Sequence, residues 1–222
     1  MKIVIPAKEN SSRVPSKNWR PFYQGKSLVE VKIEQLLGVF DPKDIYLSCD
    51  TEVRSEVAIE YGIQFVLRDS ILAADETPWA QAVTGIIDSI PCSIEEDILW
   101  AEVTSPLFNE YSGLVAAWSR NKQDHDSLLT VNEVKEFLIN EKGRAVNFNY
   151  GHWHCRSQDL EPLYSMEATF IMAKKNILEF NYPVGVKPYL FVLRDRSVEI
   201  DTLAEFELAQ QLYTQKKKHE VD

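Results

Sequence analysis

The first 130 residues alternate short apolar runs with segments whose apolar residues recur at helical spacing. The apolar runs predict buried strands, and they lie at residues 3–5, 44–50, 64–67, 97–103 and 126–131. The segments with helical spacing predict helices, and they lie at residues 28–37, 51–61, 78–90 and 112–121. Strands that alternate with helices are typical of a parallel sheet covered on both faces. The pattern therefore predicts an α/β fold built as a three-layer sandwich with a mostly parallel sheet.

The pattern changes between residues 136 and 164, where regular periodicity is lost and aromatic residues gather. His152, His154 and Cys155 raise the possibility of a metal site, but their spacing matches no common zinc motif. An aromatic strand or loop is the better interpretation, and exposed aromatic surface needs a partner. We therefore expect a single domain, residues 1–222, in which residues 136–170 form a small dimerisation arm of a homodimer.

Composition narrows the classes of protein that this chain can belong to. The 222 residues include 24 Lys and Arg against 34 Asp and Glu, a net charge of −10, which argues against a broad surface for nucleic acid. The three cysteines form no CxxC pair, so structural zinc and a disulfide framework are poorly supported. No apolar run approaches the roughly 20 residues that span a bilayer, and the chain begins with a strand rather than a signal peptide. We expect a cytoplasmic protein with no nucleic-acid or membrane partner.

The loop after the first strand carries the most distinctive chemistry. Pro6 ends the strand, and Asn10, Ser11 and Ser12 favour turns that leave backbone N–H groups accessible. Arg supplies a planar fork for phosphate and Lys a point charge, and the loop holds three such cations, Lys8, Arg13 and Lys17. The loop therefore suits a polyphosphate, although composition alone allows a solvated basic loop. It is neither a P-loop nor a Rossmann fingerprint, because GxxxxGK[ST] and GxGxxG are both absent.

A pair of acidic residues lies near the C-terminus. Glu199 and Asp201 are two apart on an extended segment, so both side chains face one way. Such a pair can hold Mg²⁺ against a nucleotide, because this metal prefers one or two carboxylates plus phosphate oxygens. The structural alternative is that Asp201 or Thr202 caps the following helix, with Glu205 in its first turn. The two interpretations are compatible.

The order of these residues resembles the nucleotide-binding signature of the CMP-sialic acid synthetase family of cytidylyltransferases, P-A-R-x-x-S-x-R-x-P-x-K-N. This chain matches it from Pro6 to Asn18, with Lys8 in place of Arg. The family's L-R-P-x-x-L-A-x-D-x-T/S block is matched from Leu67 to Thr77, although Asp75 also suits a cap for the helix from Pro78. The resemblance implies that CTP is bound by Ala7, Lys8, Asn10, Ser11, Arg13, Lys17, Asn18, Arg68 and Asp75.

Later blocks extend the resemblance over nearly the whole chain. Residues 102–108 are similar to Q-P-T-S-P-L-R, residues 156–164 to R-x-Q-x-L-P-x-x-Y/F, and residues 199–209 to D-I-D-T-x-x-D-x-x-x-A. The last block implies Mg²⁺ as a cofactor on Glu199 and Asp201. The other two blocks and the segment after them imply an acceptor pocket, to which the arm contributes, with contacts from Glu102, Thr104, Ser105, Arg156, Gln158, Tyr164 and Glu167.

The resemblance implies a Rossmann-like nucleotidyltransferase that moves CMP from CTP to the hydroxyl of a nonulosonic-type sugar acid and releases pyrophosphate. Positioning and electrostatics would supply most of the rate, with Lys8, Arg13, Lys17 and Asp201 as the catalytic candidates. Departures from the family pattern at Phe108, Glu167 and Ala168 leave another acceptor open, including KDO, although the Q-G-D-E-P-type motif of KDO enzymes is absent. The changes at Lys8 and Glu102 also leave open a CTP-binding relative with reduced catalysis.

Overall fold

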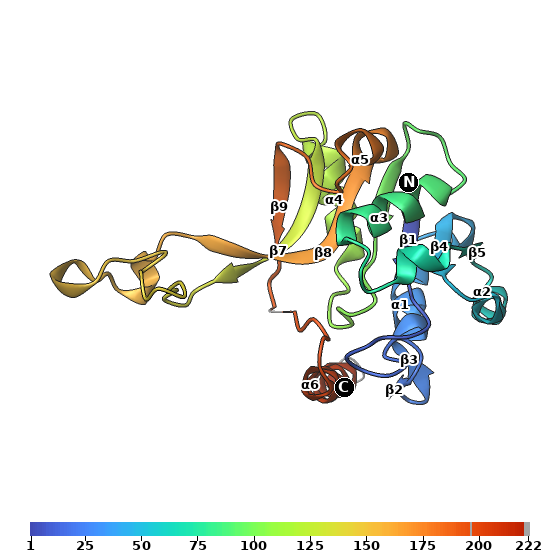
Figure 1. Ribbon diagram of the computed structural model, residues 1–222, viewed down its shortest axis with the longest axis horizontal. Coiled ribbons are helices and arrows are strands. Elements are labelled where there is room, and N and C mark those ends of the chain that lie inside the picture. The colour runs from blue at the N-terminus through green and yellow to red at the C-terminus, as the bar shows by residue number, and fades with distance from the viewer. Residues whose placement is uncertain (196, 220–222) are drawn as a thin grey trace.

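The computed structural model describes residues 1–195 and 197–219, without the side chain of Ala168. Within these residues, one seven-stranded sheet has the order β5-β4-β1-β6-β8-β7-β9 (Figure 1). Its strands are β1 (Lys2–Pro6), β4 (Ile45–Cys49), β5 (Gln64–Leu67), β6 (Asp97–Trp100), β7 (Ser127–Val134), β8 (Leu163–Ala173) and β9 (Pro188–Val192). A separate two-stranded sheet pairs β2 (Pro21–Tyr23) with β3 (Lys26–Ser27).

The large sheet is mostly parallel, as predicted, but one strand runs the other way. β8 is antiparallel to both β6 and β7, with Asp97 opposite Ala173 and Ser127 opposite Met172. The remaining neighbours in the sheet pair in parallel. β8 is reversed because it returns from the arm directly alongside β7. β8 and β9 were not predicted from the sequence.

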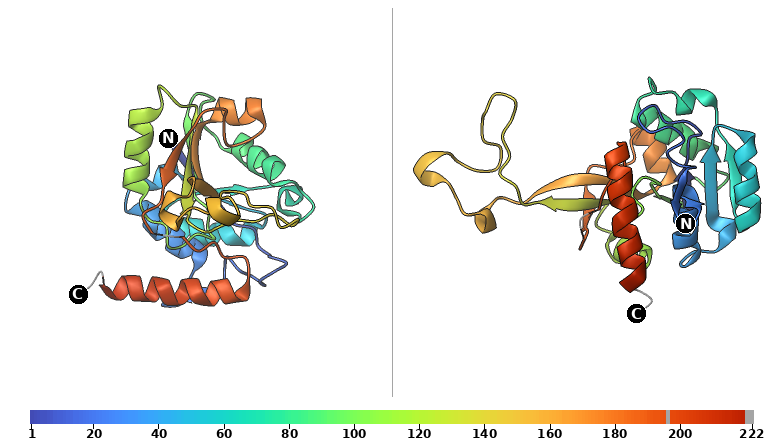
Figure 2. Two further views of the ribbon diagram at one scale, coloured as in Figure 1. Left: turned by 90° about the vertical axis from the view of Figure 1, so that its left-hand side faces the viewer. Right: turned by 90° about the horizontal axis from the view of Figure 1, so that it is seen from below.

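Helices cover both faces of the sheet and give the predicted three layers (Figures 1 and 2). They are α1 (Leu28–Leu37), α2 (Ser55–Tyr61), α3 (Trp79–Ser89), α4 (Tyr111–Asn121), α5 (Lys174–Phe180) and α6 (Leu203–His219). Side chains of α1, α2, α4 and α6 pack in one apolar cluster with Ile3 and Ile5, and those of α3 and α5 pack in a second cluster with Val4. Alternate residues of β1 thus face opposite layers, as expected for a buried parallel strand.

Local capping chemistry explains several helix boundaries. α1 begins at a capping box, in which Ser27 and Glu30 each accept a hydrogen bond from the other's backbone N–H. The predicted helix at residues 51–61 is split into a 3₁₀ turn, η2 (Glu52–Arg54), and α2. α2 ends at Gly62 as predicted, because glycine adopts the left-handed conformation found there, with φ of 68°. No helix among the described residues is both long and apolar enough to cross a membrane.

The segment between β7 and β8 extends away from the body as an arm (Figures 1 and 2). Its aromatic rings pack on one another, with Phe137 and Phe148 centroids 5.1 Å apart and His154 4.6 Å from Phe137. No group of three or more His, Cys, Asp or Glu residues in the described parts of the chain can hold a metal ion. His154 therefore belongs to an aromatic cluster, which agrees with the aromatic interpretation of this stretch.

Candidate active site

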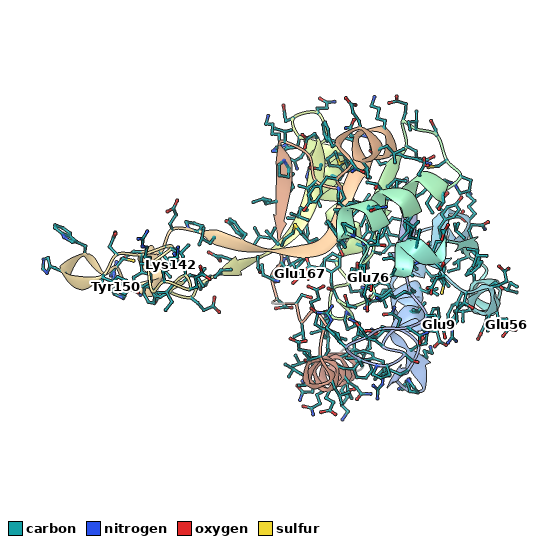
Figure 3. All side chains as sticks on the ribbon, in the orientation of Figure 1. Glu9, Glu56, Glu76, Lys142, Tyr150 and Glu167 are labelled. Carbon is teal, nitrogen blue, oxygen red and sulfur yellow. The ribbon has the colours of Figure 1, made fainter. Side chains whose placement is uncertain are left out.

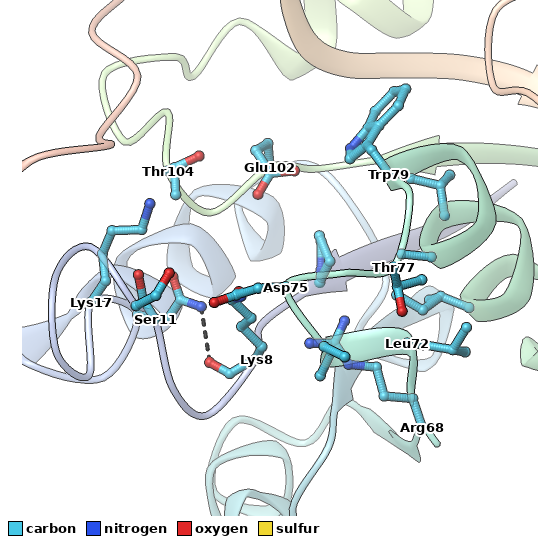
Figure 4. A pocket seen from close by; sticks show the side chains of 18 of the residues that line it. Lys8, Ser11, Lys17, Arg68, Leu72, Asp75, Thr77, Trp79, Glu102 and Thr104 are labelled. Atoms are coloured by element: carbon cyan, nitrogen blue, oxygen red, sulfur yellow. Dashed lines mark hydrogen bonds and ion pairs between the residues drawn. The ribbon is translucent and has the colours of Figure 1, made fainter. Parts of the chain in front are cut away.

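A cavity of about 380 Å³ opens at the carboxyl end of β1. Its walls come from the loop after β1, the segment between β5 and α3, the segment after β6 and the segment before α6 (Figure 4). Ligands commonly bind at this edge of an open α/β sheet. The cavity gathers eleven of the predicted site residues: Lys8, Ser11, Arg13, Lys17, Asn18, Arg68, Asp75, Glu102, Thr104, Glu199 and Asp201.

The three loop cations are each paired with an acidic residue from a distant segment. Lys8 Nζ lies 2.5 Å from Asp75 Oδ1, and Arg13 Nη2 lies 2.8 Å from Asp201 Oδ1. Lys17 Nζ is 3.6 Å from the same Asp201 oxygen and donates a hydrogen bond to the carbonyl of Ile200. Burial lowers the pKa of Lys17, against the opposing effect of Asp201. The loop is therefore joined to both the β5–α3 segment and the C-terminal segment.

The two expected helix caps have different outcomes. The prediction that Asp75 caps α3 is wrong. The residue before α3 is Pro78, and no side chain forms a capping hydrogen bond there. Asp75 instead turns toward Lys8, because a charged donor is available there. The cap before α6 is confirmed, since Thr202 Oγ1 accepts from the N–H of Glu205 and the Glu205 carboxylate accepts from the N–H of Thr202.

Two buried polar atoms on the cavity wall have no hydrogen-bond partner among the described residues. They are Asn18 Oδ1 and Arg68 Nε, in side chains only 6% and 7% exposed. Asn18 Nδ2 donates to the carbonyl of Lys8, and Arg68 Nη2 lies 3.5 Å from Asp50 Oδ1, so each side chain is fixed at one end and free at the other. Buried polar groups are almost always hydrogen-bonded. These two atoms are therefore available to a polar ligand in the cavity.

Three carboxylates, Glu102, Glu199 and Asp201, line the same cavity. Trp100 Nε1 donates to Glu102 Oε2 at 3.0 Å, and burial raises the pKa of Glu102. Burial, and then the negative charges of Glu102 and Asp201, raise the pKa of Glu199 to about 7. A cation would relieve this repulsion. Glu199 and Asp201 are the kind of carboxylate pair that fits Mg²⁺ when phosphate oxygens and water complete its coordination. No group of three or more His, Cys, Asp or Glu residues in the described parts of the chain could hold a metal ion by itself.

Four further predicted site residues do not line the cavity: Ala7, Asn10, Ser105 and Glu167. Ala7 is buried and its N–H donates to Ser48, while Asn10 is exposed on the loop. Ser105 Oγ donates to Glu167 Oε2 at 3.2 Å, and Asn132 Nδ2 donates to the other Glu167 oxygen. Glu167 is buried at the base of the arm (Figure 3). Its hydrogen bonds connect β8 to β7 and to the segment after β6.

The arm residues predicted for the acceptor pocket do not line the cavity of their own chain. Arg156 is exposed and paired with Asp159, with Nε 2.7 Å from Oδ2. Gln158 is exposed in the neighbouring 3₁₀ turn, η5 (Ser157–Asp159), and Tyr164 is half exposed near the start of β8. Their role in acceptor binding stays a prediction.

Sequence reasoning missed Lys32, which lies beneath the site. Lys32 is fully buried on α1 and donates to the carbonyl of Ser105 at 3.0 Å and to Tyr111 Oη at 2.9 Å. Burial lowers its pKa to about 7. These hydrogen bonds connect α1 to the segment after β6. A lysine between Val29 and Ile33 on the apolar face of a predicted helix was the signal for a buried cation.

The fold defines the broad class of this protein. Solved nucleotidyltransferase structures superpose on it, among them a CMP:2-keto-3-deoxy-manno-octonic acid synthetase with TM-score 0.66 and 14% identity, covering 97% of this chain and 98% of that one. The 4-diphosphocytidyl-2C-methyl-D-erythritol synthase of Anaerococcus prevotii gives TM-score 0.62 and 12% identity, covering 96% and 98%. At these identities the likeness shows the fold alone, which is that of the α/β nucleotidyltransferases.

The chain belongs to the cytidylyltransferase family, whose sequence profile matches residues 2–221. It is 32% identical to a pseudaminic acid cytidylyltransferase of Campylobacter jejuni, covering 98% of this chain and 97% of that protein. It is 28% identical to an N-acylneuraminate cytidylyltransferase of Streptococcus agalactiae over 91% of this chain. The chain spans about half of that relative, 51% of its length.

Proposed function

We propose that this protein transfers CMP from CTP to the hydroxyl of a nonulosonic-type sugar acid and releases pyrophosphate. One observation carries the proposal: Asn18 Oδ1 and Arg68 Nε, which have no hydrogen-bond partner among the described residues, are buried at a cavity that also holds the loop cations and a pair of carboxylates. Such a site offers donors and an acceptor for a nucleotide together with cations for its phosphates. The family match and the nonulosonate-specific names of the relatives support the choice of substrates.

In this proposal the chain's own residues position the reactants and neutralise charge. Lys8, Arg13 and Lys17 hold the triphosphate, and the acceptor hydroxyl oxygen attacks the α-phosphorus of CTP. A bond forms between them as the bond from the α-phosphorus to the oxygen that bridges it to the β-phosphorus breaks. Pyrophosphate leaves with the electron pair of that bond, and the hydroxyl proton is released to water. Mg²⁺ held by Glu199 and Asp201 would supply positive charge to the phosphate oxygens. The accelerating effects are orientation and electrostatic stabilisation.

In this proposal the acceptor binds beside Glu102 and Thr104, which line the same cavity as Lys8 and Arg68 (Figure 4). The Glu102 carboxylate accepts a hydrogen bond from Trp100, and its chemistry suits a hydroxyl or amide N–H of the acceptor. A carboxylate repels another carboxylate at short range, so the acid group of the acceptor would bind away from Glu102. We place the reaction in the cytoplasm, where CTP is available.

We further infer that the arm pairs with a second copy of the chain. Its exposed apolar side chains include Trp153, 78% exposed, and Ile139, 60% exposed. Single exposed apolar residues are ordinary, but a cluster on a projecting arm needs cover. Replacing both Trp153 and Ile139 with Asp should convert a dimer into a monomer in sedimentation analysis, while Lys142→Asp, an equally exposed arm change, should not. A monomeric wild type would contradict the inference.

The test of the proposed reaction is pyrophosphate release from CTP in the presence of Mg²⁺ and a panel of 2-keto sugar acids. The panel holds sialic, legionaminic and pseudaminic acids, KDN and KDO, with ATP, GTP and UTP as nucleotide controls. We expect release with CTP and at least one nonulosonic acid. Bound CTP with no release across the panel would favour a relative that has lost turnover, and would count against the proposed reaction.

A further inference from the structure

The phosphate-binding loop already holds an anion supplied by the chain itself. Lys8 Nζ donates to Asp75 Oδ1 at 2.5 Å, although the two residues are 67 positions apart. Asp75 lies between the 3₁₀ turn η3 (Ser70–Ala73) and α3, and its side chain lies beside Lys8 of the loop (Figure 4). A carboxylate is thus bound by one of the cations that the proposed function assigns to the triphosphate.

Apart from joining the loop to the β5–α3 segment through Lys8, Asp75 has no helix-capping role. α3 begins after Pro78 without a side-chain cap, so the carboxylate is not needed to start that helix. Its side chain is 52% exposed. The pKa of Asp75 is lowered by hydrogen bonds from Lys8 and Ser12 and by the charge of Arg13, which all belong to the same loop. Asp75 is therefore surrounded by the groups that a phosphate would use.

The ion pair between Lys8 and Asp75 is weak enough for a ligand to replace Asp75. Lys8 is 31% exposed and Asp75 52% exposed, so water and salt screen their attraction. The coupling energy of such ion pairs is small and changes an equilibrium constant only about two- to fivefold. A triphosphate carries more charge than a single carboxylate, and can displace Asp75 from Lys8.

We propose that Asp75 is a product-release residue, an internal anion that competes with the phosphates for Lys8 and reclaims it as pyrophosphate leaves. This inference rests on the proposed function of the loop. Asp75 acts through Lys8 rather than on the reacting atoms, so it is a positioning residue. It lowers the affinity for CTP slightly and the affinity for pyrophosphate as well, which limits inhibition by that product.

The experiment compares Asp75→Asn with Glu76→Gln, an adjacent exposed change that alters net charge equally. Calorimetric titrations use CTP, inorganic pyrophosphate and cytidine at fixed Mg²⁺ and ionic strength. We expect Asp75→Asn to tighten the binding of CTP and pyrophosphate about two- to fivefold. Cytidine, which has no phosphate, should bind both proteins equally, and Glu76→Gln should match the wild type.

Three results would overturn the proposal. They are weaker binding of pyrophosphate by Asp75→Asn, unchanged binding of pyrophosphate, or equal tightening in Glu76→Gln, which would reveal a general effect of charge. Failure of the proposed function is distinguishable from these results. If no protein bound CTP, the nucleotide assignment would fall, and the pyrophosphate titration would still decide whether Asp75 competes for Lys8.

Discussion

Arg13 Nη2 lies 2.8 Å from Asp201 Oδ1, which brings the first loop of the chain against the segment before its last helix. The same oxygen lies 3.6 Å from Lys17 Nζ, and Lys17 also donates to the carbonyl of Ile200. The site is therefore assembled from both ends of the chain. Its geometry depends on α6 being packed against the body, through contacts such as Phe206 with Phe22, whose ring centroids are 5.4 Å apart.

Asp201→Ala should abolish CMP transfer while leaving the fold intact. Asp201 is 41% exposed and supplies no apolar packing, whereas in the proposed mechanism it binds the metal and orients Arg13. Loss of a metal ligand removes several kcal/mol of charge stabilisation, so turnover should fall at least about 100-fold. Pyrophosphate release measures this loss, with Glu207→Gln on the exposed face of α6 as the control. Unaltered turnover would refute the metal assignment.

Arg68→Lys should weaken CTP binding about 10- to 100-fold. Lysine keeps the charge but removes the planar fork and the buried Nε that has no partner in the described structure. A hydrogen bond to a charged group contributes about 1.5 to 3 kcal/mol, which corresponds to that range of dissociation constants. Calorimetry with CTP gives the value, and Arg120→Lys on the exposed face of α4 is the matched control. Equal affinities for wild type and Arg68→Lys would remove Arg68 from the nucleotide site.

Lys32 should make stability depend on pH. Its pKa in the folded protein is about 7, below the ordinary 10.5, so the unfolded chain binds more protons between these values. The free energy of unfolding contributed by this group therefore falls as pH decreases from about 10.5 to 7. Glu102 and Glu167 oppose the shift but do not reverse it.

Urea denaturation at pH 7 and pH 9.5 measures this effect in wild type and Lys32→Met. The wild type should gain stability relative to the variant at the higher pH, because methionine carries no titratable group. Lys142→Met, at an exposed position of the arm (Figure 3), should show no such difference. A stability gap between wild type and Lys32→Met that is identical at both pH values would contradict the assignment.

Gly185→Ala should destabilise the loop before β9. An added Cβ would lie 2.3 Å from the Asp126 carboxyl carbon, and Asp126 cannot move freely because it accepts from the N–H groups of Val186 and Lys187. Overpacking of this kind costs about 1 to 3 kcal/mol. The control is Gly113→Ala on α4, where the nearest side-chain atom is 3.8 Å away and alanine favours the helix. Thermal unfolding should give a lower midpoint temperature than the wild type for Gly185→Ala and a higher one for Gly113→Ala.

Local patterns predicted much of the fold, and long-range pairing explains the rest. The strands β1, β4, β5, β6 and β7 and the helices from α1 to α4 follow apolar periodicity, which neighbouring residues determine, whereas the short strands β2 and β3 were not predicted. β8 was missed because its pairing with β6, such as Asp97 with Ala173, joins segments that are far apart in the sequence, and because β8 begins at the end of the aromatic stretch. β9 is an edge strand with exposed apolar residues, so no alternation marks it.

The site could likewise be predicted only in part, because local motifs identified candidate residues but not their long-range contacts. The motifs identified Lys8, Arg68, Glu199 and other candidates, and the structure gathers these residues around one cavity. The pairing of Lys8 with Asp75 was not predictable, because a capping role at Pro78 is equally consistent with local sequence. Trp79 and Trp100, which also line the cavity, carry no motif signal, since aromatic residues near strand and helix ends usually belong to a core.

The central claim is that CMP passes from CTP to a sugar acid, and mass spectrometry of the products tests it most directly. The protein is incubated with CTP, Mg²⁺ and each nonulosonic acid, and the conjugate of CMP with the acid is quantified against pyrophosphate. The account predicts one such conjugate formed with pyrophosphate in equal amounts, and its loss in Asp201→Ala. Absence of any conjugate while CTP remains bound, or equal conjugation from UTP or ATP, would contradict it.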